Sequence, residues 1–99
     1  MDTRQQLLDM VLGVVEELEG KDGYDDPIEW LDDQLSVETI KKTPYGIWKG
    51  AEILVAFGGP NIIVDTEYET VTGIWGTDTF KRDYKDCIGV DEFLSEMYS

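Results

Sequence analysis

Residues 53–75 read ILVAFGGPNIIVDTEYETVTGIW, and this stretch decides the fold. It belongs to three runs rich in β-branched and aromatic residues, which is the composition of β-strands. Short polar or glycine-rich segments separate the runs. Connections this brief can join antiparallel strands but not parallel ones, which need a long crossover. The stretch therefore predicts an antiparallel meander that includes strands at residues 47–57, 61–65 and 70–75.

The same pattern continues on both sides of this stretch. Residues 35–42 and 79–84 are further candidate strands, connected through residues 43–46 (TPYG) and 76–78 (GTD). Proline and glycine in such short connections are typical of turns. The sequence thus predicts a sheet of four or five strands.

The N-terminus has helical periodicity, and Thr3 to Glu19 is predicted to form an amphipathic helix. Thr3 and Gln6 have the spacing of a capping box, and Gly20 stands where a left-handed residue would end the helix. The apolar side, expected to pack on the core, consists of Leu7, Leu8, Val11, Val14, Val15 and Leu18. The opposite side is polar and consists of Asp2, Gln5, Asp9, Glu16 and Glu17.

A short second helix is predicted after a turn at residues 21–25, because Asp26 can cap it and Pro27 suits its first position. It is expected to run to about Gln34. The stripe expected to be buried consists of Ile28, Leu31 and Leu35. Trp30 falls off this stripe and lies among acidic residues.

The chain closes with helical spacing over residues 90–97, where Asp91 and Glu92 occupy the first turn and suit the positive end of the helix dipole. We therefore expect one α+β domain over residues 1–99. Its order is two N-terminal helices, an antiparallel meander of four or five strands and a C-terminal helix. Two layers result if the helices cover one face of the sheet.

The charge is strongly negative and unevenly placed. The net charge is −14 with no histidine, and the share of residues 1–34 is −9, of residues 35–85 −1 and of residues 86–99 −4. This balance argues against direct binding of nucleic acid or of an anionic membrane, since both bind through Lys and Arg. No apolar run is long enough to span a bilayer, and the single Cys87 agrees with a reducing compartment. We expect a cytoplasmic protein.

Candidate catalytic and metal sites are weak. Without histidine, Cys87 lacks the usual activating base of a nucleophile. Asp22, Asp25 and Asp26 crowd one turn and could bind a hard cation, although their spacing is not that of an EF-hand. The turn at residues 58–61 could form an anion nest or be a plain turn held by an Asn61 hydrogen bond. We expect neither a cofactor nor a metal.

The acidic helix faces have three interpretations: an ordinary solvated surface, adaptation to salt, or imitation of nucleic acid. In the third, clustered carboxylates occupy the basic groove of a protein that handles DNA or RNA. Trp30 either packs against the first helix or serves as an aromatic anchor for a partner. The residues predicted to bind a partner are Asp9, Glu16, Glu17, Glu29, Trp30, Asp32 and Asp33.

Residues 56–66 and 70–78, with a Gly-Gly-Pro-Asn turn and a Gly-x-Trp-Gly-x-Asp segment, resemble small acidic proteins of bacterial phages and other mobile elements. The acidic C-terminal helix adds to this likeness. The resemblance implies an anti-defence context, such as that of anti-CRISPR and anti-restriction proteins, and it carries no functional residue with it.

The leading hypothesis is a non-catalytic inhibitor or adaptor that binds the basic, nucleic-acid-binding surface of a protein partner. One alternative is an enzyme or metal-dependent module that uses the turn carboxylates. Another is a small structural or assembly protein of a phage particle. The sequence leaves the oligomeric state open.

Overall fold

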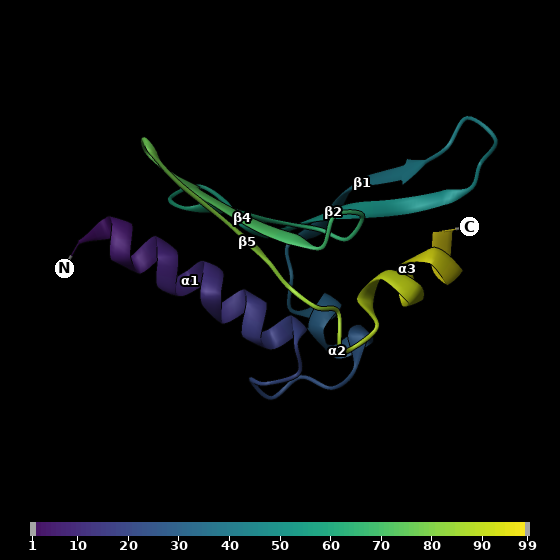
Figure 1. Ribbon diagram of the computed structural model, residues 1–99, viewed down its shortest axis with the longest axis horizontal. Coiled ribbons are helices and arrows are strands. Elements are labelled where there is room, and N and C mark those ends of the chain that lie inside the picture. The colour runs from purple at the N-terminus through teal and green to yellow at the C-terminus, as the bar shows by residue number, and fades with distance from the viewer. Residues whose placement is uncertain (1, 99) are drawn as a thin grey trace.

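The computed structural model describes residues 2–98, and its architecture is α+β (Figure 1). Five strands form one antiparallel sheet in the order β1-β2-β3-β4-β5, so the predicted meander is confirmed with its fifth strand. The helices are α1 (Thr3–Leu18), α2 (Pro27–Asp32) and α3 (Val90–Tyr98). The strands are β1 (Ser36–Lys42), β2 (Trp48–Ala56), β3 (Asn61–Asp65), β4 (Thr70–Trp75) and β5 (Asp78–Asp83).

Strand register separates a core face of the sheet from an open face. Ile53 pairs with Val64, which pairs with Val71, and all three side chains are fully buried. Their neighbours along each strand point to the other side because side chains alternate along a strand. The β2–β3 turn is held as expected by Asn61, whose side-chain oxygen accepts a hydrogen bond from the Gly58 amide at 3.2 Å.

The helices lie on one face of the sheet, as expected (Figure 1). Helix α1 crosses β4 and β5, α3 packs on β2, and α2 packs on α3. Close approach of α1 requires Gly73 in β4, where a Cβ atom would stand 2.6 Å from Val11 Cγ2 and 2.9 Å from Leu7 Cδ1. The missing side chain therefore makes room for the apolar side of the helix.

Helix α1 has the predicted core side but a different N-terminal cap. Leu7, Val11, Val14 and Leu18 are buried, whereas the cap is Asp2, whose carboxylate accepts from the Arg4 amide at 3.0 Å. The capping box predicted at Thr3 is wrong because the carboxylate of the preceding residue already takes that role. Gly20 is left-handed as expected, with φ of 75°.

Helix α2 is shorter than predicted and buries a different side chain. It ends at Asp32 instead of Gln34 and has six residues. Trp30 is 0% exposed, whereas Ile28 is 48% and Leu35 is 60% exposed, so the predicted buried stripe is wrong at these two residues. Leu31 is partly buried and packs against the core. So short a helix can turn few side chains inward, and a tryptophan removes the most apolar area from water.

The packing of Gly73 gives a first prediction. Gly73→Ala should lower the free energy of unfolding by about 1–3 kcal/mol, because the new methyl group overlaps Val11 and Leu7. Gly13→Ala is the matched control: a Cβ there meets nothing within 4 Å, and alanine in a helix should add about 0.5–1 kcal/mol. Urea unfolding followed by circular dichroism measures both. Equal stability of the two variants would contradict this packing.

Candidate functional site

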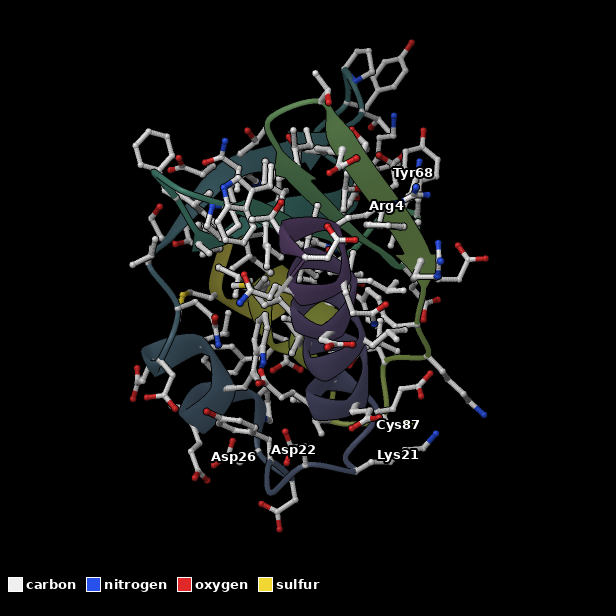
Figure 2. All side chains as sticks on the ribbon, turned by 90° about the vertical axis from the view of Figure 1, so that its left-hand side faces the viewer. Arg4, Lys21, Asp22, Asp26, Tyr68 and Cys87 are labelled. Carbon is white, nitrogen blue, oxygen red and sulfur yellow. The ribbon has the colours of Figure 1, made fainter. Side chains whose placement is uncertain are left out.

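The most highly charged surface is formed by residues 16–33, which we call the acidic end. It comprises the last turn of α1, the connecting loop and α2, and carries nine acids and one base. Figure 2 shows Asp22 and Asp26 together with Lys21 at this end of the molecule. The acids are Glu16, Glu17, Glu19, Asp22, Asp25, Asp26, Glu29, Asp32 and Asp33.

Few of these carboxylates are neutralised. Among residues 2–98, the ion pair at the acidic end joins Lys21 and Glu19 at 3.0 Å. On the sheet, by contrast, Lys41 pairs with Asp65 at 2.6 Å and with Glu67 at 3.3 Å. The negative field is therefore concentrated where the helices meet.

The acidic end is held together by a contact between α1 and α2. The Trp30 indole Nε1 donates to the Glu17 carboxylate at 2.9 Å, and the Tyr24 hydroxyl donates to Asp33 at 2.5 Å. Burial raises the pKa of Glu17, and the charges of Asp22 and Asp33 add to this against the Trp30 hydrogen bond. The hydrogen bond to Asp33 raises the pKa of Tyr24 to about 12.

Four of the predicted partner-binding residues lie exposed at the acidic end: Glu16, Glu29, Asp32 and Asp33. Asp9 is also exposed but lies two turns earlier on α1, where it accepts from the Gln5 amide at 2.9 Å. Glu17 is half-buried because it serves the contact with Trp30.

Trp30 itself requires a correction. Its side chain is 0% exposed and belongs to the core, so the expectation of an exposed aromatic anchor is wrong. The packing alternative holds, because the indole is part of the buried core and its N–H donates to Glu17 near the end of α1. A helical wheel drawn for α2 alone does not predict this burial, because residues of other elements form the core around Trp30.

Acids from the C-terminus join this surface. Helix α3 packs on α2, and a hollow of about 240 Å³ between them is lined by Pro27, Phe93, Glu92 and Glu96 among others. Sequence reasoning missed Glu92 and Glu96 as site residues, since only the folded chain brings the two acidic ends of the sequence together.

Two other C-terminal acids have structural contacts. Asp86 accepts from the backbone amides of Gly89, Val90 and Asp91 and so caps α3. Asp91 accepts from the Trp48 indole at 3.0 Å and from the Thr66 hydroxyl at 2.7 Å. Both line a polar hollow of about 430 Å³, whose walls are thus tied to the position of α3.

Nothing in the described residues favours the alternative of a metal site. Within residues 2–98, no three His, Cys, Asp or Glu side chains are arranged to hold a metal ion. Asp26 instead caps α2 through the Ile28 amide at 3.0 Å. No helix in the same range is long and apolar enough to cross a membrane.

Comparisons with protein-family models, with curated proteins and with solved structures find no match to this chain. Its function is therefore inferred from its own residues.

The raised pKa of the half-buried Glu17 predicts that stability depends on pH. A carboxyl whose pKa is raised on folding stabilises the fold below its ordinary pKa, and this contribution is lost as the pH rises through the folded value. Glu17→Gln keeps an oxygen for Trp30 and removes the charge. The variant should melt at a higher temperature than the parent at pH 7, and the difference in melting temperature should vanish below the ordinary glutamate pKa of 4.5.

Melting curves from pH 3 to 8 test this, with Glu16→Gln as the control, since Glu16 is exposed on the same turn. A gap that stays constant over that range would contradict the assigned cause.

Mutual repulsion at the acidic end predicts stabilisation by salt. The Debye length, over which charges act on one another, falls to about 3 Å at 1 M salt. The melting temperature should therefore rise with NaCl concentration. It should rise less in Glu29→Lys/Asp32→Lys, because this variant already relieves the repulsion. At equal ionic strength, MgCl₂ should act like NaCl. A much larger effect of Mg²⁺ at low concentration would instead indicate a bound metal.

Proposed function

We propose that this protein is a non-catalytic inhibitor or adaptor whose acidic end occupies the basic, nucleic-acid-binding surface of a protein partner. The observation that carries the proposal is the charge of the acidic end, which is −8 over residues 16–33. Within this segment, all of which the structure describes, the ion pair is that of Lys21 with Glu19. Like charges so close together lower stability, and a basic partner would relieve the repulsion.

The spacing of the carboxylates supports a likeness to a phosphate track. Glu29, Asp32 and Asp33 are three and four positions apart on and just after α2, which places such side chains about 5–6 Å apart. Phosphates follow each other at about 3.4 Å of axis rise along one DNA strand. Binding of this kind is fast and weakens steeply with salt.

The resemblance of the meander to small acidic proteins of mobile elements directs the search for a partner. Bacterial complexes that target foreign nucleic acid have the required basic channels, and we propose them as the first candidates. On this proposal, the protein competes with DNA or RNA for the partner and leaves the partner chemically unchanged.

Two double variants test the surface. Glu29→Lys/Asp32→Lys reverses the charge of two exposed acids at the acidic end. Asp33 is left unchanged because its carboxylate accepts a hydrogen bond from Tyr24. Glu38→Lys/Asp83→Lys makes the same change in net charge on the two edge strands, β1 and β5. With the partner captured from bacterial lysate, the first variant should raise the Kd at least about tenfold and the second much less.

Duplex DNA added to the captured complex should release the partner. Equal losses in both variants would show that net charge alone drives binding, and DNA that leaves the complex intact would contradict competition for a nucleic-acid site.

A further inference from the structure

An apolar groove runs between α2 and α3, next to the acidic end. It has a volume of about 210 Å³, and Val37 of β1 contributes to its lining. The side chains that give it its character are Ile28, Leu31, Val37, Phe93, Met97 and Tyr98. Ile28 is 48%, Met97 57% and Tyr98 40% exposed, so much of this apolar surface faces water.

The groove exists because Trp30 is buried. On a short helix, turning Trp30 toward α1 turns Ile28 and Leu31 away from that helix and toward α3. Ile28, which the sequence marks as part of a core stripe, thus lies 48% exposed in the groove, and the partly buried Leu31 lines it. An apolar pocket with a charged border is typical of a protein-binding hot spot.

Charge along the groove specifies its occupant. Asp32 is part of its wall, and Phe93 also lines the neighbouring hollow that contains Glu92 and Glu96. The ammonium group of Lys42 lies near the end of α3, where it donates to the Tyr98 carbonyl at 2.5 Å. An apolar side chain entering the groove therefore arrives beside at least three carboxylates.

We infer that the groove receives an apolar side chain from a basic amphipathic helix of the protein partner, with a lysine or arginine one turn away lying against Glu92 and Glu96. Residues three or four apart on a helix are neighbours, so one helical segment can supply both groups. This inference rests on the proposed function and extends it, because it adds an apolar contact that salt does not screen.

A second copy of this chain fits the groove poorly. Each copy carries a net charge of −14, and the groove border repeats the sign of the whole molecule. Two grooves face to face would bring the same carboxylates together, which costs binding energy. A basic helix removes that penalty.

The test uses a synthetic helical peptide with leucines on one side and lysines on the other. A peptide of the same composition in scrambled order, which cannot form the apolar side, is its control. Isothermal titration in low salt and in about 0.5 M NaCl measures both. The amphipathic peptide should bind the parent and keep measurable affinity in high salt. The scrambled peptide should have no measurable affinity in high salt.

Ile28→Ser/Met97→Ser removes the two most exposed apolar side chains of the groove. Ile47→Ser, at a residue that is 64% exposed beside β2, is the control. The groove variant should weaken the amphipathic peptide at least about tenfold and the control should not. Unchanged melting temperatures establish that both variants fold. Should the groove variant unfold, chemical-shift changes in the parent at Ile28 and Met97 on adding peptide decide the question.

Three results would overturn the inference: equal binding of both peptides, peptide binding by the groove variant as tight as by the parent, or dimerisation of the parent that the groove variant abolishes.

The proposed function can be tested separately from the groove. If the groove variant retains the captured partner while Glu16→Lys/Glu29→Lys, which leaves the groove wall unchanged, loses it, the groove assignment fails and the acidic end stands; if both variants retain it, both assignments fail.

Discussion

The burial of Trp30 beside the end of α1 is the constraint on which the orientation of α2 depends. The indole is fully inaccessible, and its N–H donates to Glu17 across the two helices. A short helix has little stability of its own in water, so α2 is held by this packing. With Trp30 fixed, the orientation of α2 is set, and so are the side chains that α2 presents to solvent.

The contact between Trp30 and Glu17 has an electrostatic cost, because it places a carboxylate in a partly buried, acidic environment. Glu17 is half-buried within reach of Asp22 and Asp33, and burial raises its pKa. On the sheet, lysines lie beside the acids and neutralise them, as Lys41 does for Asp65 and Glu67. The sheet thus carries balanced charges, whereas the acidic end carries carboxylates that few bases neutralise.

Local signals predicted the elements well where local physics decides them. Residues 61–65 and 70–75 match β3 and β4, and the other strands differ by one residue at their ends, because side-chain alternation and turn residues act over a few positions. The cap at Asp2 was missed, and the burial of Trp30 was predicted only as one of two alternatives, for different reasons. Two neighbouring residues could both cap α1, whereas the place for Trp30 is made by residues far away in sequence.

By itself, the sequence determined the α+β class, an antiparallel meander of four or five strands and the concentration of charge near its two ends, since each follows from composition, periodicity and short connections. Only the tertiary structure decided that these ends meet, because α3 must return to pack on α2 and β2 after the sheet is complete. It also decided which side of α2 is buried. Burial depends on the volume left between packed elements, and that volume is a property of the whole fold.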